Sequence, residues 1–340
     1  MAQHSYGIDL GTSNFKIYGL TNKRIINEKN VIAKKNRDDV FQYGDLAFEM
    51  YEKAPDNIEV SFPVKFGVIA DIKNMDTLFE CFYKKLNGKN ISGSGNFCIA
   101  VPTDITEVEK RAFYDMVAES RVKAKHISVV EKPIADAVGV GIDVESPRGN
   151  LIVNIGADTT EISVISLGGI VLSKLIKTGG SKFDDCICNV VRKKYNLVIG
   201  RRTAEQIKMN LADAVGGSST ETYTAYGRNI VTGLPACKEI SSELVFEAIQ
   251  ECLRSIIDSI KVILERTPPE LAADIMNTGA YLTGGSSLIK NIDQLIKNET
   301  GLKVNLDDEP EETVIRGIAE ILSNNKLSEL MYVPREKQYI

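Results

Sequence analysis

The chain has 340 residues, of which 43% are apolar and 26% are charged, and its net charge of −5 argues against nucleic acid as a main partner. The length allows two domains with separate cores, and no apolar run approaches the roughly 18 residues that span a bilayer. The first predicted strand begins too near Met1 to leave room for a signal peptide, so we expect a cytoplasmic protein, and its six scattered cysteines are expected to be reduced thiols. With two histidines, a histidine-based metal site is not expected.

Strand and helix patterns alternate from the N-terminus onward. Residues 8–14 and the run 15–20 predict a β-hairpin with a glycine-containing turn. A polar, interrupted stretch from about 31 to 66 indicates a small inserted subdomain. The other elements expected in the first half are strands at 24–27, 97–102 and 127–130 and helices at 75–83, from 106, and at 133–139.

The second half repeats this organisation. Residues 151–166 predict another hairpin, which continues into a strand at 170–172, and residues 281–287 predict a strand, a glycine turn and a helix start. The other expected elements are helices at 183–195 and 203–210, a polar stretch at 212–240 with short strands, and a loosely held C-terminal segment at 331–340. Strands that alternate with helices favour an α/β architecture.

One short pattern occurs in both hairpins. It reads IDLGTSN from residue 8 and VNIGADTT from residue 153. Successive backbone N–H groups in such turns form anion-binding concavities, and small side chains let the backbone approach a phosphate. Asp9 at the strand end could hold a hydrated Mg²⁺. Two such hairpins facing each other would clamp the phosphates of a nucleotide, whereas either one alone could be an ordinary glycine hairpin.

The order of the motifs along the whole chain is more specific than either hairpin. After the first hairpin come Glu131-Lys132-Pro133, the second hairpin, Gly179-Gly180, a helix with Glu205 and Lys208, and Thr283-Gly284-Gly285. This order resembles the actin-like ATPase superfamily, which includes sugar kinases and heat-shock chaperones. Within it, the segments 67–71, 164–167 and 268–275 are similar to those of the bacterial actin MreB family, and the resemblance runs from about residue 5 to about residue 322.

The resemblance implies an α/β fold of the actin-like type, with two domains, each carrying a small inserted subdomain, and nucleotide in the central cleft. We therefore expect a first domain at 1–138 with its inserted subdomain at about 31–66. The second domain is expected at 139–324 with its inserted subdomain at about 182–245, and the C-terminal segment 325–340 is expected to return to the first domain.

The resemblance also implies the ligands, ATP and Mg²⁺, and the residues that bind them. Asp9 would hold Mg²⁺ through water. The first phosphate loop would consist of Gly11, Thr12, Ser13 and Asn14, and the second of Gly156, Ala157, Asp158 and Thr159, with Gly180 nearby. The nucleoside would be met by Glu205, Lys208, Gly284, Gly285 and Ser286. The alternative is that Glu205 and Lys208 form an ordinary surface pair and that the 283–285 segment is an ordinary turn.

The chain departs from the family it resembles at the position expected to direct the attacking water. Family members usually carry Glu-Glu-Pro where this chain has Glu131-Lys132-Pro133. Lys132 has no acceptor for a proton of that water. The alternative is that Glu131 serves instead. General-base assistance typically contributes about 10²–10⁴-fold, so the sequence predicts slow ATP hydrolysis, with Glu131, Lys132 and Thr159 as the candidate catalytic residues.

Two further departures change the charge around the phosphates. Asn154 stands where the family usually has Asp, and Asp158 where it usually has Gly. An anion beside the γ-phosphate requires compensation, and Lys16 or Lys132 could provide it. The family commonly has an apolar residue at the position of Lys16. Together the altered residues indicate a diverged paralogue within the family.

The function implied by the resemblance is ATP-dependent assembly into cytoskeletal filaments for cell shape or movement. Two alternatives remain: a small-molecule kinase of the same superfamily, and a nearly non-hydrolysing scaffold that co-assembles with related MreB-type proteins. Direct membrane binding is expected to be weak or absent, because the N-terminus is short for an amphipathic helix and the loop 90–96 offers only Ile91 as an apolar anchor.

Overall fold

The computed structural model describes residues 4–36, 39–88, 94–216 and 220–334. The chain forms two compact units. Unit 1 contains the described residues up to Pro147, the segment Ile165–Ser173 and the described residues from Glu312 on. Unit 2 contains Arg148–Val164 and Lys174–Glu311. The chain passes from one unit to the other after Pro147, Val164, Ser173 and Glu311, and the domain bounds expected at 138/139 and 324/325 stay a prediction.

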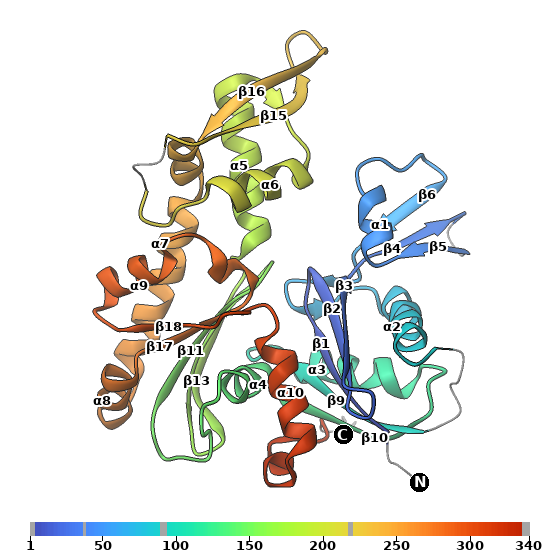
Figure 1. The fold of residues 1–340 in the computed structure, drawn as a ribbon, viewed down its shortest axis with the longest axis vertical. Coiled ribbons are helices and arrows are strands. Elements are labelled where there is room, and N and C mark those ends of the chain that lie inside the picture. Colours follow the sequence, from blue (N-terminus) through green and yellow to red (C-terminus); the bar gives the residue numbers. More distant parts are fainter. Residues whose placement is uncertain (1–3, 37–38, 89–93, 217–219, 335–340) are drawn as a thin grey trace, which may run out of the picture. The chain divides into compact units, whose positions relative to one another are not determined.

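Unit 1 is built on a mixed sheet with the strand order β10-β9-β1-β2-β3 (Figure 1). Its strands are β1 (His4–Leu10), β2 (Asn14–Gly19), β3 (Arg24–Lys29), β9 (Gly95–Val101) and β10 (Ala124–Glu131). The hairpin expected at the N-terminus is present, since β1 and β2 pair antiparallel. Strands β1, β9 and β10 are parallel, so their carboxyl ends meet at one edge of the sheet.

Two helices of unit 1 are fixed by local capping and by burial. Helix α2 (Ile72–Asn87) begins after Asp71, whose side chain accepts from the Asn74 backbone N–H. Helix α3 (Glu107–Ala118) begins with a capping box in which Thr106 and Glu109 bond to each other's backbone. The apolar faces of both helices join the sheet in one core, which includes the aromatic side chains Phe15, Phe79, Phe82, Phe97 and Phe113.

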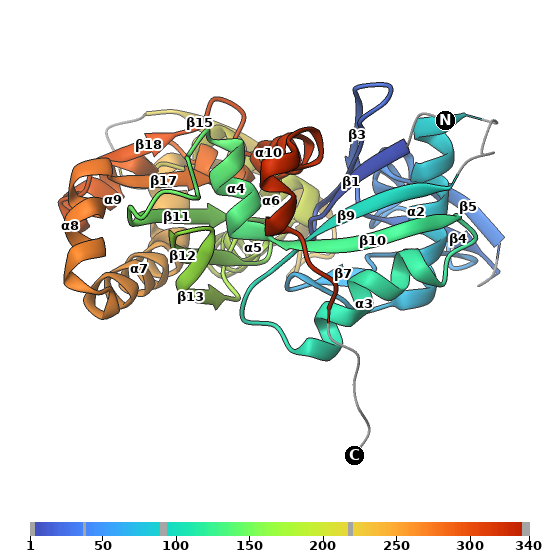
Figure 2. The same ribbon diagram turned by 90° about the horizontal axis from the view of Figure 1, so that it is seen from below.

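Helices α4 (Lys132–Gly139) and α10 (Thr313–Ser323) lie side by side in unit 1 (Figure 2). Their backbones come into direct contact. A Cβ added at Gly317 would lie 1.8 Å from the Ala135 carbonyl oxygen, and one added at Gly139 would lie 2.1 Å from the Thr313 carbonyl oxygen. This contact joins α10, far along the chain, to α4 near the end of the first half, and explains why unit 1 includes the chain again from Glu312.

The stretch that was expected to form an inserted subdomain has its own small sheet and core. Its elements are β4 (Ile32–Lys35), β5 (Asp39–Tyr43), α1 (Asp45–Met50) and β6 (Ile58–Ser61). The sheet has the order β5-β4-β6. Val31, Ala33 and Ala47 are the buried residues of its core cluster. A short hairpin of β7 (Val64–Lys65) and β8 (Val68–Ile69) follows, and its turn contains Gly67 with a positive φ of 80°.

Unit 2 is built around a sheet in the order β13-β12-β11-β17-β18. Its strands are β11 (Asn150–Ile155), β12 (Thr160–Ser166), β13 (Gly169–Ile176), β17 (Ala280–Thr283) and β18 (Val304–Leu306). Strands β11, β17 and β18 run parallel. The outer ends of β12 and β13, Ile165–Ser173, belong to unit 1. The second hairpin predicted from the sequence is thus present.

The helices of unit 2 come after β13 in the sequence. They are α5 (Gly180–Tyr195), α6 (Arg201–Leu211), α7 (Ser242–Arg266), α8 (Pro269–Thr278), α9 (Ile292–Thr300) and the 3₁₀ turn η1 (Gly285–Leu288). A small sheet in the order β14-β15-β16 accompanies α5 and α6 (Figure 1). Its strands are β14 (Leu197–Val198), β15 (Thr222–Asn229) and β16 (Pro235–Ser241).

The hairpin of β15 and β16 is longer than the short strands expected at 212–240. Ala225 and Ile240 are the buried apolar residues of the two strands, and most of the others are exposed or half-buried. The two strands therefore bury few apolar side chains that could mark them in sequence, and backbone pairing holds them together.

The C-terminal segment is anchored more firmly than expected from its polar sequence. After η2 (Asn325–Leu330), Tyr332 exchanges two backbone hydrogen bonds with Val129 of β10, of 2.7 and 3.0 Å. The last residues, 335–340, lie outside the described residues.

In the described part of the chain, no helix is both long and apolar enough to span a membrane. The anchor residue considered from the sequence, Ile91, lies outside the described residues.

Candidate functional site

The first glycine-containing turn lies at the carboxyl end of β1 in unit 1. The side chain of the buried Asn30 donates to the Gly11 carbonyl oxygen at 2.8 Å, and its backbone N–H donates to the Ser13 carbonyl oxygen at 2.8 Å. Lys29 Nζ donates to Ser13 Oγ at 3.1 Å. Thr12 Oγ1 accepts from the Gly67 backbone N–H. The loop is therefore held in one shape by its neighbours.

Asn14 extends this network along the strands. Its amide accepts from Ser13 Oγ at 2.9 Å and donates to Asn27 at 2.8 Å, and Asn27 in turn donates to Glu312 at 3.2 Å. Asn14 thus links the turn to the residue that precedes α10. The sequence did not single out three residues of this network, Asn27, Lys29 and Asn30. They lie next to the turn because β3 pairs with β2.

Asp9 lies at the end of β1 between two lysines. Lys16 is the direct partner of Asp9 in the antiparallel pair β1–β2, and its Nζ lies 3.0 Å from Asp9 Oδ2. Lys132 begins α4, and its Nζ lies 3.0 Å from Asp9 Oδ1. Each carboxylate oxygen thus has its own ammonium group. Asp9 and Lys16 are only 3% and 6% exposed.

The two lysines decide the charge state of Asp9. Burial alone raises the pKa of this carboxyl group, but the charges of Lys132 and Lys16, with their hydrogen bonds, outweigh burial and lower the pKa from 3.8 to about 2. The carboxylate of Asp9 is therefore ionised at neutral pH, and each of its oxygens faces a lysine side chain.

A Mg²⁺ ion does not fit this arrangement well. Mg²⁺ demands near-octahedral oxygen ligands and keeps several waters. Here both oxygens of the expected ligand, Asp9, are within 3.0 Å of an ammonium group. A water of a hydrated Mg²⁺ would have to displace one of these groups to reach Asp9, and the ion would approach two positive charges.

We expect the stabilising effect of the Asp9 ion pairs to disappear in acid. Because the folded-state pKa is lowered from 3.8 to about 2, the contribution is complete above the unfolded pKa and is lost as the pH falls toward the folded pKa. A shift of this size corresponds to about 2 kcal/mol. Urea unfolding of the wild type and Lys16→Met should show a stability difference that is constant at neutral pH and shrinks below pH 4. A difference independent of pH would contradict the assignment.

Glu131, the alternative residue for positioning water, is bound by other side chains of unit 1. Its Oε1 accepts from Tyr332 Oη at 2.5 Å and from Lys110 Nζ at 3.1 Å. Its Oε2 is buried and has no hydrogen-bond partner among the described residues. Burial, followed by the bond to Glu131, raises the pKa of Tyr332, so the hydroxyl remains a donor. Glu131 thus anchors the C-terminal segment and keeps one oxygen for other use.

Tyr332→Phe is expected to destabilise unit 1. The change removes a hydrogen bond to a charged acceptor, which is worth about 1–3 kcal/mol, and urea unfolding measures the loss. Tyr226→Phe is the matched control, because Tyr226 is 71% exposed. Phosphate release from ATP should stay within about twofold of the wild type, since a positioned base is worth far more. A larger change would show that Glu131 takes part in hydrolysis.

The second glycine-containing turn lies in unit 2, where it is packed against the start of α5. The Gly156 backbone N–H closes the turn by donating to the Thr159 carbonyl oxygen at 2.8 Å. The carbonyl oxygens of Gly156 and Ala157 accept from the backbone N–H groups of Gly180 and Ser181 at 3.0 and 2.7 Å. Gly179 is required for this approach, because a Cβ there would lie 2.6 Å from the Gly156 oxygen.

The 284–286 segment adds a third piece to the same region of unit 2. Ser286 Oγ donates to the Gly156 carbonyl oxygen at 2.8 Å. Gly284 has a φ of +83°, and a Cβ there would lie 2.4 Å from the Ile155 oxygen and 2.7 Å from Asn154 Oδ1. Gly285 begins η1. The structure thus brings together segments that are far apart in sequence. Ser286 and Gly156, which share this hydrogen bond, are separated by 130 positions.

Lys208 of α6 reaches this region through two contacts. Its Nζ donates to the Gly180 carbonyl oxygen at 3.1 Å and lies 2.8 Å from Asp184 Oδ1. Burial raises the pKa of Asp184 to about 6, although Lys208 opposes the shift and nearby Glu205 adds to it. Asp184 was not singled out from the sequence, and only the packing of α5 on α6 reveals it. Asp158 and Thr159 are half-buried at the tip of the turn.

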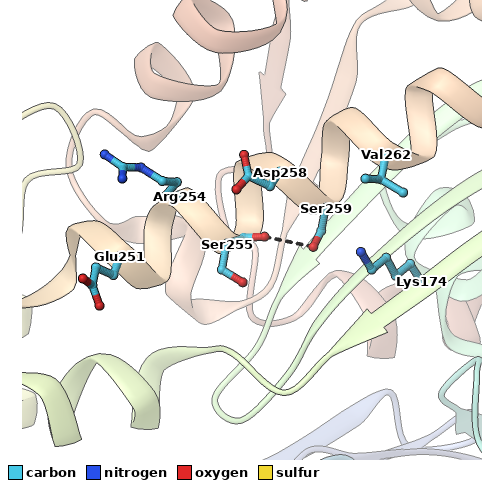
Figure 3. Close-up of a pocket in the computed structure, with 7 residues that line it drawn as sticks. All are labelled: Lys174, Glu251, Arg254, Ser255, Asp258, Ser259 and Val262. Carbon is cyan, nitrogen blue, oxygen red and sulfur yellow. Dashed lines mark hydrogen bonds between the residues drawn. The ribbon is translucent and has the colours of Figure 1, made fainter.

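Unit 2 has a further hollow of about 400 Å³ that contains none of the predicted site residues. Figure 3 shows that most of its lining comes from one face of α7, including Arg254, Asp258 and Ser259, with Lys174 of β13 opposite. Ser259 Oγ donates to the Ser255 carbonyl oxygen at 2.9 Å. The lining carries balanced charges and gives no indication of a particular ligand.

The sheets, their helices and a glycine-containing hairpin in each unit define an α/β protein of the actin-like class. A model of the MreB/Mbl protein family matches residues 3–329, and the chain belongs to that family. It is 38% identical over 325 residues to the cell shape-determining protein Mbl of Bacillus subtilis, covering 95% of this chain and 97% of the relative. It is 36% identical over 323 residues to the cell shape-determining protein MreB of Escherichia coli, covering 93% and 92%.

A solved structure is similar over almost the whole length. MreB5 of Spiroplasma citri bound to AMPPNP matches with a TM-score of 0.91 and 32% identity, over 97% of this chain and 98% of that chain. The MamK double helical filament matches with a TM-score of 0.80 at 22% identity, which supports the fold alone. These findings confirm the family and the fold class expected from the sequence.

Proposed function

We propose that this protein is an actin-like filament protein that binds adenine nucleotide, assembles with itself, contributes to cell shape or movement, and hydrolyses ATP slowly. The observation that carries the proposal is the match to the MreB/Mbl family over residues 3–329. Its relatives are described as cell shape-determining proteins, and a similar MreB5 structure is bound to AMPPNP. A cytoplasmic location and co-assembly with related MreB-type proteins are parts of this proposal.

The residues proposed to bind nucleotide form two groups, one within each unit. In unit 1, the turn with Gly11, Thr12, Ser13 and Asn14 binds phosphate through its backbone N–H groups. In unit 2, the turn at Gly156–Thr159 binds phosphate, and Gly180 lies beside it at the start of α5, where the dipole of a helix of sixteen residues favours an anion. The closely packed 284–286 segment and Glu205 receive the nucleoside. Lys208 supports the site by holding the Gly180 carbonyl in place.

Slow hydrolysis is supported by two side chains of unit 1. Lys132 stands where a water-positioning carboxylate is expected, and it pairs with Asp9. Glu131 is occupied by Tyr332 and Lys110 on one oxygen. Phosphoryl transfer relies on positioned groups around the attacking water and the γ-phosphate. Because residue 132 is a lysine and not a carboxylate, we expect the protein to bind ATP and to hydrolyse it slowly.

The experiment that tests the function measures phosphate release and sedimentation on the same sample of purified protein with ATP. Filaments that sediment while phosphate release is slow support the proposal. Sedimentation only when a related filament protein is added identifies a co-assembling scaffold. Phosphate transfer to a small molecule without sedimentation contradicts the proposal and identifies a kinase.

A further inference from the structure

Asp9 and Lys16, which are buried, form with the half-buried Lys132 a group whose charge resembles that of a metal site. A Mg²⁺ ion bound to Asp9 would leave one net positive charge on the pair. Two ammonium groups that face the same carboxylate leave the same net charge on these three side chains. Asp9 is therefore compensated here without a metal ion.

We propose that the ammonium groups of Lys16 and Lys132 take the place of Mg²⁺ at this site, so that the protein binds the polyphosphate of an adenine nucleotide without a divalent cation. The inference rests on the nucleotide binding proposed above and specifies how unit 1 meets the phosphates. It replaces the role of metal ligand that the family resemblance implied for Asp9.

The fold fixes both lysines in place. Lys16 faces Asp9 because the two residues are direct cross-strand partners in the hairpin whose turn is the first phosphate loop. Lys132 follows β10, and the order β10-β9-β1 with parallel pairing brings the end of β10 to the sheet edge where β1 ends. Neither position depends on a ligand, so the two charges are preorganised.

The position of Lys132 is unfavourable unless its charge has a purpose or a partner. It is the first residue of α4, and a cation at a helix N-terminus opposes the helix dipole. Asp9 offsets this repulsion with one oxygen while Lys16 occupies the other. One carboxylate thus faces two ammonium groups, and an anion that reaches the loop would approach both of them.

The chemistry of the lysines explains why such a site would bind without catalysing well. An ammonium group is a point charge with three donors that suits phosphate oxygens. It lacks the fixed octahedral geometry with which a hydrated Mg²⁺ positions phosphate oxygens and water. The ligand class is therefore a nucleoside di- or triphosphate, and tight binding is compatible with slow hydrolysis.

The test is a titration with a fluorescent ATP analogue carrying a methylanthraniloyl group, in EDTA and in Mg²⁺. The wild type should bind with dissociation constants that agree within about threefold between the two conditions. Lys16→Met removes one charge-assisted contact and should weaken binding about tenfold in EDTA, with recovery in Mg²⁺. Lys16→Arg keeps the charge and should retain binding in EDTA.

Lys125→Met is the matched control, because Lys125 is an exposed residue near the opposite end of β10. It should bind as the wild type does. Thermal unfolding followed by circular dichroism verifies that each variant is folded, and Lys16→Arg keeps the test informative if Lys16→Met does not fold.

Two results would overturn the inference. The first is that the wild type binds the ATP analogue more than about tenfold more weakly in EDTA than in Mg²⁺. The second is that Lys16→Met binds the analogue in EDTA as tightly as the wild type does, which would assign the lysines to stability alone. Absence of binding by the wild type in both conditions would instead contradict the proposed nucleotide binding. The failure of the inference and the failure of the proposed function are therefore distinguishable.

Discussion

Lys132→Glu is expected to increase phosphate release from ATP by about tenfold or more, because a positioned acid–base group typically contributes about 10²–10⁴-fold. The variant places a carboxylate at the start of α4, where it can accept a proton of the attacking water. It also removes the ammonium group 3.0 Å from Asp9 Oδ1 and frees that oxygen. The measurement is phosphate release in the presence of Mg²⁺, at saturating ATP.

Lys132→Gln is the control for this increase. It removes the positive charge and frees the same oxygen of Asp9 without adding a carboxylate, so it should leave phosphate release near the wild-type rate. If Lys132→Glu binds ATP and releases phosphate no faster than the wild type, position 132 does not limit hydrolysis. An equal increase in both variants would assign the effect to Asp9 rather than to the new acid.

The two variants also connect with the metal-free binding inferred for the wild type. Each lacks one of the two ammonium groups beside Asp9, so nucleotide binding should become weaker in EDTA and recover in Mg²⁺. Lys132→Glu, which adds a negative charge at the same point, should show the larger dependence on Mg²⁺. Hydrolysis and metal dependence would then change together through one residue.

Gly317→Ala is expected to lower the free energy of unfolding by about 3 kcal/mol, at the upper end of the cost of overpacking. A Cβ at this position would lie 1.8 Å from the Ala135 carbonyl oxygen. That oxygen belongs to the backbone of α4, so the two helices must separate. In an exposed helix the same change would increase stability by about 1 kcal/mol. The sign of the effect therefore reports the contact between α4 and α10.

Urea unfolding measures this effect, and Gly169→Ala provides the matched control. Gly169 lies in the part of β13 that belongs to unit 1, and a Cβ there would meet only the Ser166 carbonyl oxygen at 3.8 Å. That substitution should change the free energy of unfolding by less than about 1 kcal/mol, as for most surface positions. A Gly317→Ala variant as stable as the wild type would show that the helices can move apart without cost.

A substantial part of the fold follows from local sequence patterns. The turn at Gly11, the cap at Thr106 with Glu109, and the proline near the start of α4 each have a local physical cause, and the corresponding elements are present. The length of the hairpin of β15 and β16 was underestimated, because its strands bury few apolar side chains. The candidate site residues are grouped within each unit as their motifs suggested, and their roles remain predictions.

The contact between Asp9 and Lys16 can be predicted from the sequence once the turn of the hairpin is located. Both residues belong to one hairpin, and once the turn is known the register makes them partners. The contact of Lys132 with Asp9 required the tertiary structure, because the strand order β10-β9-β1 brings together residues that are remote in sequence. The same holds for Asp184 with Lys208, which depends on the packing of α5 against α6.

The sequence by itself determined the family, the two glycine-containing turns and the unusual residues at positions 16, 132, 154 and 158, because these depend on residue type and order. Only the tertiary structure decided that Asp9 holds two lysines and that Glu131 binds Tyr332, a residue 201 positions away. The physical reason is that charge pairing depends on distances of a few ångströms across the sheet. Those distances are set by strand order and helix packing, which residue type and spacing do not encode locally.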